Sequence, residues 1–477
     1  MKKERGLALA ACAALAALLP LYPLNIWGDA NCLLTVGRVM KSGGVLYRDI
    51  YEQKGPLLYL IHALAACISD TSFWGVYLLE IPALTAALYA AYRLLRLRAG
   101  ACFSLGAAAV WGALTVTGGA FMRGDSAEEF CLPLLTAALA LAYAEYGRRA
   151  KPMRAKRLLV CGVLAGCVAA IKYTLLGAMV GLCVVEGVLA LKEGGVKRAA
   201  QSAGVFLAGM AVPILPWALY FAANGALSDA YTAYLYNNIF LYSGEAASWG
   251  QKLRELARYV AQNALWAVPA ALGLISLALD RGETAAVRGC VIAMAACQFA
   301  AVFLVGRVWA YSLLALAAFG VAGCMQLHRA LKKIGRPRAE KALTAAACAA
   351  SLLWAYFATP NAFLRGQKLD ELAQGRLAAV VEDGATLLQY SHLDDGLYLA
   401  AHTLPREKYF VRLNVQSGEM REALDRAVRD GEPDYVLVSW RELPAEFDRY
   451  RLVAADVGYD DENRLNKMLY LYRRKSE

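Results

Sequence analysis

The sequence predicts a mainly α-helical, polytopic membrane protein with a small α/β domain at its C-terminal end. Of its 477 residues, 59% are apolar and 19% are charged, whereas soluble globular proteins average about 45–50% apolar and about 25% charged residues. Residues before Pro360 hold most of the apolar sequence, and their 33 Lys and Arg against 18 Asp and Glu give a net charge of +15. The remaining 17 basic and 21 acidic residues give −4. This composition argues against a disordered protein and against a nucleic-acid partner.

Eleven segments before Pro360 are long and apolar enough to cross a bilayer, which takes about 17 to 25 helical residues. We therefore expect about 11 transmembrane helices. They cover approximately residues 7–26, 72–94, 101–118, 129–147, 157–172, 174–191, 200–223, 259–279, 287–305, 308–327 and 341–358. The first segment also has features of a signal peptide, but no small-x-small cleavage site stands at its end, which favours a span.

The loop charges predict the orientation of the chain. Lys and Arg are enriched in every second loop, beginning with Lys2, Lys3 and Arg5, and short cytoplasmic loops carry this excess. The N-terminus is thus expected in the cytoplasm of a multi-pass protein of the cell (plasma or inner) membrane. An odd number of spans then makes the C-terminal domain extracytoplasmic.

Residues 360–477 are expected to form this small soluble α/β domain, and residues 1–359 the membrane domain. Four short runs rich in Leu, Val and Tyr predict strands, and one amphipathic run predicts a helix. The strands are expected near 385–391, 434–440, 450–458 and 467–474, and the helix over 419–429. The domain has no Cys and needs no disulfide outside the cytoplasm. The 12 cysteines lie singly in apolar runs, which favours packing over metal or redox chemistry.

Polar residues in the membrane part gather in two outer loops, residues 27–59 and 118–129. In the first loop, Asp29 follows the first span, residues 30–41 suit an amphipathic helix lying along the interface, and Lys54 precedes the return to the bilayer. An ordinary solvated loop with snorkelling basic residues is the alternative interpretation.

The second loop brings further charges to the same predicted side. It contains Arg123 and Asp125, and Ser126 with Glu129 forms a capping box for the next helix. Lys172 stands at a third outer turn, where snorkelling is again the alternative. Carboxylates beside cations at the membrane surface suit sugar transfer from a polyprenyl phosphate. That reaction needs a carboxylate to take the acceptor's proton and cations to stabilise the departing phosphate.

The first loop also resembles a known family. Its segment DANCLLTVGRVMKSGGVLYRDIYEQKGPLLYLIHAL, residues 29–64, is similar to the first outer loop of membrane glycosyltransferases related to protein O-mannosyltransferases and the aminoarabinose transferase of lipid A, which have the GT-C fold. In that family an Asp precedes an interfacial helix, and a K-x-P-like element enters the membrane. Here these are Asp29 and Lys54-Gly55-Pro56, and RGDS resembles the family's R-x-D element with Arg123 and Asp125.

The resemblance implies an inverting glycosyltransferase that moves a hexosyl or pentosyl group from a polyprenyl-phosphate donor at the outer face of the membrane. Asp29 would be the general base or orient the acceptor, and Asp125 would be the second active-site carboxylate. Lys54, Arg123 and Lys172 are candidates for binding the donor phosphate. Further candidates in the outer loops are Arg48, Asp49, Tyr51, Glu128, Tyr242 and Arg307.

Departures from the family pattern concern the substrates. Gly55 stands where many relatives have a second proline, and Ala30 follows Asp29 where some members have an acidic residue. The sugar and the acceptor, which can be a protein, a lipid or a cell-wall polymer, therefore stay open. Tyr242 belongs to a tyrosine-rich outer segment that suits either membrane anchoring or a lid over the lipid carrier, and Arg307 suits either snorkelling or phosphate binding.

Two other functions compete with transfer. A transporter or lipid flippase would place charges near the bilayer midplane, and a membrane scaffold would use its tail to bind partners. Membrane lipids are expected partners in each case. No motif demands a cofactor or a metal site, and dependence on a divalent metal stays open.

Overall fold

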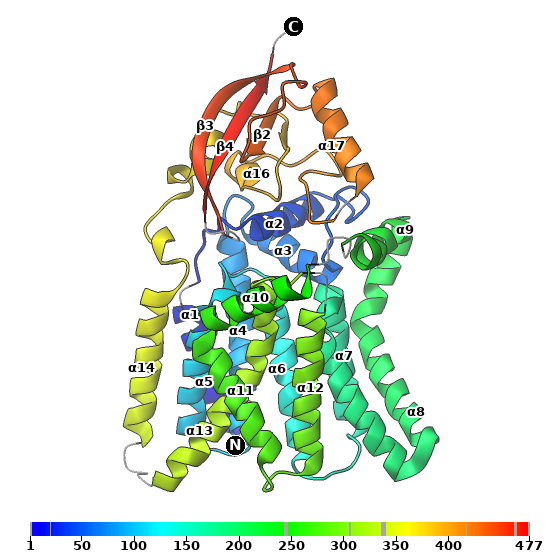
Figure 1. Cartoon of the computed structure of the whole chain (residues 1–477), viewed down its shortest axis with the longest axis vertical. Helices are drawn as coiled ribbons and strands as arrows, with labels where there is room; N and C mark the ends of the chain where they lie inside the picture. Colours follow the sequence, from blue (N-terminus) through cyan, green and yellow to red (C-terminus); the bar gives the residue numbers. More distant parts are fainter. Residues whose placement is uncertain are drawn as a thin grey trace. The chain divides into compact units, whose positions relative to one another are not determined.

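Helices dominate the structure, a computed structural model that describes residues 2–19, 21–242, 247–304, 307–334, 340–415, 417–461 and 465–475 (Figure 1). The chain forms two compact units. The bundle unit comprises Met1–Leu21, Glu80–Trp217 and Ala246–Ala362, and the sheet unit comprises Tyr22–Leu79, Ala218–Glu245 and Phe363–Glu477. The predicted mainly α class with a small C-terminal sheet is confirmed. The expected division into domains 1–359 and 360–477 stays a prediction.

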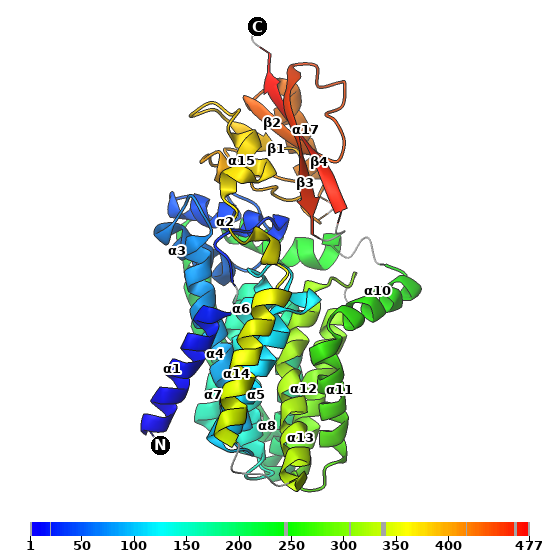
Figure 2. The same cartoon turned by 90° about the vertical axis from the view of Figure 1, so that its left-hand side faces the viewer.

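The bundle unit contains apolar helices that run side by side (Figures 1 and 2). They are α1 (Lys2–Leu18), α5 (Ala101–Val116), α6 (Ala127–Tyr146), α7 (Ala155–Lys172), α11 (Ala264–Leu279), α12 (Ala285–Phe303), α13 (Gly320–Ile334) and α14 (Glu340–Ala358). Two more helices, α4 (Trp74–Leu95) and α8 (Gly177–Ala223), have residues in both units. Short 3₁₀ helices, η1 (Gly119–Phe121), η2 (Tyr173–Leu175) and η5 (Tyr311–Phe319), complete the unit.

The expected count of about 11 spans is not confirmed. Among the described residues, seven helices are long and apolar enough to cross a membrane, or eight if α11 and α10 (Trp249–Gln262), which are bent by 102°, count as one span. The difference has local causes. Helix α1 ends at Leu18 and does not extend to residue 26, because Pro23 lies between them and disfavours helix. The expected span 174–191 begins in η2 and continues in α8, and the expected span 200–223 lies in the same helix after its break at Gly194 and Gly195.

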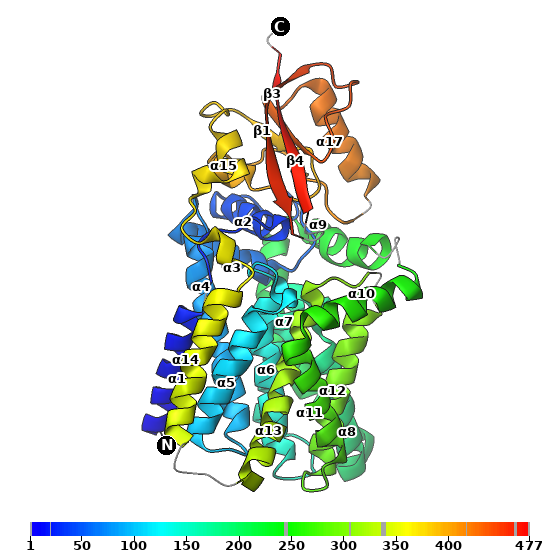
Figure 3. The ribbon, with the colours of Figure 1, turned by 60° about the vertical axis from the view of Figure 1, so that its left-hand side comes forward.

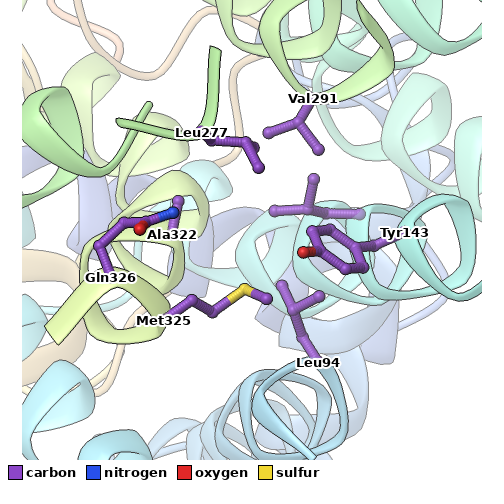
Figure 4. A pocket seen from close by; sticks show the side chains of 8 residues that line it. Leu94, Tyr143, Leu277, Val291, Ala322, Met325 and Gln326 are labelled. Carbon is purple, nitrogen blue, oxygen red and sulfur yellow. The ribbon is translucent and has the colours of Figure 1, made fainter. Parts of the chain in front are cut away.

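A small cavity lies within the bundle unit (Figure 4). Tyr143 of α6, Leu277 of α11 and Met325 of α13 are among the side chains that line it. Its volume of about 10 Å³ has room for about one water molecule. The Tyr143 hydroxyl donates a hydrogen bond of 2.6 Å to Glu283 Oε1. This cavity is therefore a packing feature and is too small for a substrate.

The sheet unit contains a four-stranded sheet in the order β1-β2-β4-β3. Strand β1 (Leu387–Gln389) pairs in parallel with β2 (Tyr435–Ser439), and β4 (Leu465–Arg474) pairs antiparallel with both β2 and β3 (Tyr450–Asp460). Helix α17 (Gly418–Asp430) lies beside the sheet and buries Met420, Leu424, Ala427 and Val428 on one face (Figure 3). The four predicted strands and the predicted helix are confirmed. Shorter elements are α9 (Leu227–Ala230), the π-helix η3 (Tyr231–Leu241), α15 (Ala373–Ala378), α16 (Leu397–Ala400), and the 3₁₀ turns η7 (Ala362–Leu364) and η8 (Leu369–Glu371).

Two further helices of the sheet unit pack tightly together. Helix α2 (Gly28–Lys41) confirms the helix expected over 30–41, whereas α3 (Pro56–Ile68) was not expected from the sequence. A Cβ atom on Gly37 of α2 would lie 2.4 Å from the backbone carbon of His62, so only glycine permits this approach. Helix α2 is also tied to the C-terminal part of the unit, because the Thr35 hydroxyl donates a bond of 2.7 Å to Asp394 Oδ2.

The close approach of α2 and α3 predicts a large effect of adding one methyl group. We expect Gly37→Ala to lower the free energy of unfolding by about 1–3 kcal/mol, because the backbone of α3 must move. The matched control is Gly204→Ala in α8, where a Cβ meets no atom within 4 Å and alanine favours helix by about 1 kcal/mol. Thermal unfolding of the purified protein in detergent measures both, and equal melting temperatures would contradict the packing argument.

Candidate functional site

Asp29, Glu52 and Lys54 form a buried charge cluster in the sheet unit. The Lys54 Nζ atom lies 3.0 Å from Asp29 Oδ1 and 3.1 Å from Glu52 Oε1. The three side chains are only 9%, 4% and 0% exposed for Lys54, Asp29 and Glu52. Burial alone would lower the pKa of Lys54, but the two carboxylates raise it above its usual value. Lys54 is therefore an ammonium ion at every physiological pH.

The local backbone positions these three side chains. Asp29 lies in the first turn of α2, where the helix dipole favours a negative charge. The Oε2 atom of Glu52 accepts hydrogen bonds from the backbone N–H groups of Gln53 at 2.7 Å and of Lys54 at 2.9 Å. The Tyr47 hydroxyl donates to the Lys54 carbonyl at 2.5 Å. The loop that carries Lys54 is thus held by its own side chains.

This cluster can accept a proton and bind an anion. An ammonium group has three N–H donors, and the two carboxylates take two of them, which leaves one for an oxygen of an incoming phosphate. The Asp29 carboxylate lies 3.0 Å from that cation. A base and a cation with fixed positions are the groups that transfer of a phosphate-linked sugar requires.

Asp125 lies in the bundle unit and is held through its backbone. It is 1% exposed and has a positive φ of 58°. Its N–H group donates to Glu80 Oε1 at 2.9 Å and to Glu129 Oε2 at 2.7 Å. A Cβ on the preceding Gly124 would lie 2.8 Å from Glu80 Oε1, so glycine makes room for that carboxylate. The turn thus places Asp125 directly before α6.

The expected capping box at this helix is formed only in part. The Ser126 hydroxyl accepts a bond of 3.0 Å from the Glu129 N–H, as predicted. The Glu129 carboxylate accepts from the N–H of Asp125, one residue before the cap. The positive φ of Asp125 turns its N–H toward the helix, which explains the change of partner.

Lys172 and Arg123 also have partners within the bundle unit. The Lys172 Nζ atom lies 2.7 Å from Glu128 Oε1 and 5.0 Å from the centre of the Tyr311 ring. The Arg123 guanidinium donates to the carbonyl of Pro360, and the Asn361 amide donates to the Arg123 carbonyl at 2.9 Å. Glu128 and Lys172, two predicted site residues, are therefore brought together as an ion pair.

The remaining candidates of the first loop have structural contacts. The Arg48 guanidinium donates two bonds to the Asp49 carboxylate, at 2.7 and 2.9 Å, and holds the pKa of that carboxyl below its usual value. The Tyr51 hydroxyl accepts from the Asn237 amide at 2.8 Å, and burial raises the pKa of Tyr51 to about 12. Arg48 also donates to the Asn224 carbonyl at 3.0 Å.

The last two candidates, Arg307 and Tyr242, differ in exposure. Arg307 is half-exposed, lies 3.9 Å from Glu255 and covers the Trp309 ring at 4.4 Å from its centre. Tyr242 is half-buried and directly follows η3. Both positions stay predictions for binding.

The structure therefore gathers the predicted residues into two groups. Asp29 lies with Lys54 in the sheet unit, whereas Arg123, Asp125, Glu128 and Lys172 belong to the bundle unit. The expected convergence of Asp29 and Asp125 stays a prediction.

Sequence reasoning missed two buried carboxylates. Glu52 stands two residues before Lys54, next to the Lys54-Gly55-Pro56 element identified from the sequence. This proximity was the signal that could have identified Glu52. Glu80 stands within the apolar run 72–94, and an acidic residue in such a run is costly and marks a function or a partner. In the described parts of the chain, no group of three His, Cys, Asp or Glu side chains is placed to hold a metal ion.

Comparison with solved structures identifies the fold. ArnT from Cupriavidus metallidurans in the apo state matches with a TM-score of 0.63 and 14% sequence identity, over 98% of this chain and 97% of ArnT. ArnT bound to undecaprenyl phosphate matches with a TM-score of 0.61 and 13% identity, over 98% of this chain and 96% of ArnT. The chain has the GT-C fold. No protein-family model and no curated protein matches the sequence.

The GT-C fold predicted from the two outer loops is thus confirmed over nearly the whole chain. The similarity is one of fold, since only about one residue in seven is identical. The roles of the individual residues in the outer loops stay predictions.

The buried cluster predicts a specific instability. Lys54→Met leaves two buried carboxylates without a cation, and we expect a loss of about 3–5 kcal/mol in the free energy of unfolding near pH 7. Thermal unfolding of the purified protein near pH 7 measures this loss.

The control for this prediction is Lys41→Met, which removes the exposed ion pair with Asp70. An exposed pair contributes at most about 1 kcal/mol, so we expect a much smaller loss of stability in this variant. Equal destabilisation of the two variants would contradict the cluster's structural role.

Proposed function

We propose that this protein is a membrane glycosyltransferase that moves a sugar from a polyprenyl-phosphate donor to an acceptor hydroxyl or amine. The observation that carries the proposal is the Asp29 carboxylate held 3.0 Å from the buried Lys54 ammonium in a chain of GT-C fold. The solved ArnT structure with undecaprenyl phosphate supports a lipid-phosphate donor, because that protein of the same fold binds this carrier.

The proposed reaction is a single inverting displacement. The acceptor oxygen or nitrogen forms a bond to the anomeric carbon while the bond from that carbon to the phosphate oxygen breaks. The acceptor's proton passes to Asp29, and the electron pair of the broken bond stays with the polyprenyl phosphate. General-base assistance of this kind accelerates a reaction by about 10²–10⁴-fold.

Cations stabilise the departing phosphate in this proposal. Lys54 has one N–H left for a phosphate oxygen, and the negative charge that develops on the leaving group strengthens that bond. Arg123 and Lys172 are the other proposed phosphate ligands. Asp125, which matches the family's R-x-D element, is proposed as the second active-site carboxylate.

The proposed reaction takes place at the outer face of the cell membrane. The excess of Lys and Arg in alternate loops supports a cytoplasmic N-terminus, and both candidate loops then lie outside with the C-terminal domain. The lipid tail of the donor confines transfer to the interface.

The role of Asp29 predicts a large loss of activity in Asp29→Asn. Isolated membranes are supplied with undecaprenyl-phosphate sugars, each with a labelled sugar, and label in lipid, protein and polymer fractions is counted. We expect the initial rate to fall at least about a hundredfold, because asparagine takes no proton. Unchanged transfer would remove Asp29 from the mechanism.

The matched control is Asp70→Asn, an exposed carboxylate of the same unit that pairs with Lys41, which should retain full transfer. Thermal unfolding of both variants separates a chemical defect from a folding defect. Carrier-lipid movement without any glycosidic product in the wild-type protein would instead favour a transporter or flippase.

The orientation predicts which added thiols react from outside. In a variant with the exposed Cys67 replaced by Ser, we expect Glu446→Cys in the C-terminal domain to react with a membrane-impermeant maleimide in intact cells. Lys151→Cys, in a predicted cytoplasmic loop, should react only after permeabilisation. Both original side chains are exposed, and the opposite labelling pattern would overturn the orientation and the mechanism.

A further inference from the structure

A cavity of about 140 Å³, lined by both polar and apolar side chains, lies within the sheet unit. It has room for about ten water molecules, so one ring-sized polar molecule fits but a chain does not. Its wall combines the end of the β3–β4 hairpin with residues from the segment before α2 and from α15. Asp29 lies in α2 and Lys54 in the loop before α3, so neither residue belongs to these elements.

The polar groups of this cavity differ in kind. Gln374 and Asn466 provide two amides, Tyr459 provides an aromatic ring, and Asp395 and Lys467 provide charges. Tyr459 and Asn466 face each other across the β3–β4 pair. Amides donate to and accept from hydroxyl groups, and ionised carboxylates accept from them. An aromatic face packs against the apolar face of a ring.

Asp395 is the most constrained of these groups. Its side chain is 3% exposed and pairs with Lys467 through Oδ1, and its backbone N–H donates to Gln389 Oε1 at 2.8 Å. Its Oδ2 atom is buried and accepts no hydrogen bond from the described residues. A buried carboxylate oxygen without a donor is unfavourable, and a ligand hydroxyl would satisfy it.

Asp395 and Lys467 form an ion pair on the cavity wall. Burial lowers the pKa of Lys467, but Asp395, Asp460 and Asp461 together raise it above its usual value. A hydroxyl group can donate to the Asp395 carboxylate and accept from the Lys467 ammonium at the same time. The pair therefore suits a neutral ligand rich in hydroxyl groups.

The cavity also adjoins the loop that carries Asp29. Ile26, three residues before Asp29, lines the cavity. A Cβ on Gly28 would lie 2.9 Å from the Cβ of Leu393, which stands two residues before Asp395 in the sequence. Loss of hydration lowers the pKa of the His392 imidazole, and the negative charges of Asp29 and Asp395 oppose this lowering. Asp29 and Asp395 are therefore both near the same imidazole.

We propose that this cavity binds one neutral sugar residue of the acceptor and thereby orients a glycan acceptor beside Asp29. The inference rests on the proposed function for its link to transfer, because it names the acceptor as a glycan. The binding step itself needs no donor and no reaction, and binding is therefore the measurement that tests it.

The experiment measures saturation-transfer NMR of the purified full-length protein in detergent with methyl glycosides of glucose, galactose, mannose and N-acetylglucosamine. At least one glycoside should bind to the wild-type protein. We expect Asn466→Ala and Tyr459→Ala to weaken that binding at least about tenfold. Asn414→Ala, a half-buried position of the same unit outside the cavity wall, is the matched control and should bind as the wild type does.

The outcomes separate this inference from the proposed function. Asp29→Asn should keep glycoside binding while it loses transfer, and loss of binding in that variant would place the sugar elsewhere. Binding that is unchanged in both cavity variants, or absent for every glycoside in a protein active in transfer, overturns the inference and leaves the transferase proposal intact. Competition by inorganic phosphate would show an anion site and would also overturn it.

Discussion

The burial of Lys54 between two carboxylates is the interaction on which the candidate site depends. Asp29 begins α2 and Glu52 lies in the following loop, and the two meet at this one ammonium group. Each of the three charges would lose its hydration without compensation if it were buried alone. They can be buried only together, and their contact fixes the loop to the start of α2. The constraint that folds this loop therefore also holds a proton acceptor beside a cation.

In the bundle unit, the turn at Asp125 is fixed through the peptide group of Asp125. The carboxylates of Glu80 and Glu129 converge on the backbone N–H of Asp125, and a positive φ makes that N–H available to both. Backbone donors satisfy carboxylates at no cost in side-chain entropy, and a strained turn is tolerated where its surroundings over-determine it. The two candidate carboxylates are thus positioned by different means, one by an ion pair and one by its peptide group.

Features with a local pattern were predictable from the sequence. The Val-, Leu- and Tyr-rich run at Tyr435–Ser439 identified a strand, and the amphipathic pattern of α17 identified a helix. The apolar positions after Asp29 identified α2. Features set by distant contacts were not. Helix α3 is too short to be recognised as a span from the sequence. It packs closely against Gly37 of α2, and the sequence alone does not show this contact. The partner of Glu52 was hidden for the same reason, since a sequence shows a charge but not the loop that folds around it.

The two polar sites of the sheet unit offer different hydrogen-bonding groups. Lys54 gives two of its three N–H groups to Asp29 and Glu52, which leaves one donor. Asp395 pairs with Lys467 through Oδ1 and keeps a buried Oδ2 that accepts no hydrogen bond from the described residues, which leaves one acceptor. A phosphate oxygen can use only the donor, whereas a sugar hydroxyl can also use the acceptor, so in the proposed transfer the two sites match different substrates. Ile26, on the cavity wall three residues before Asp29, connects the two sites through the backbone.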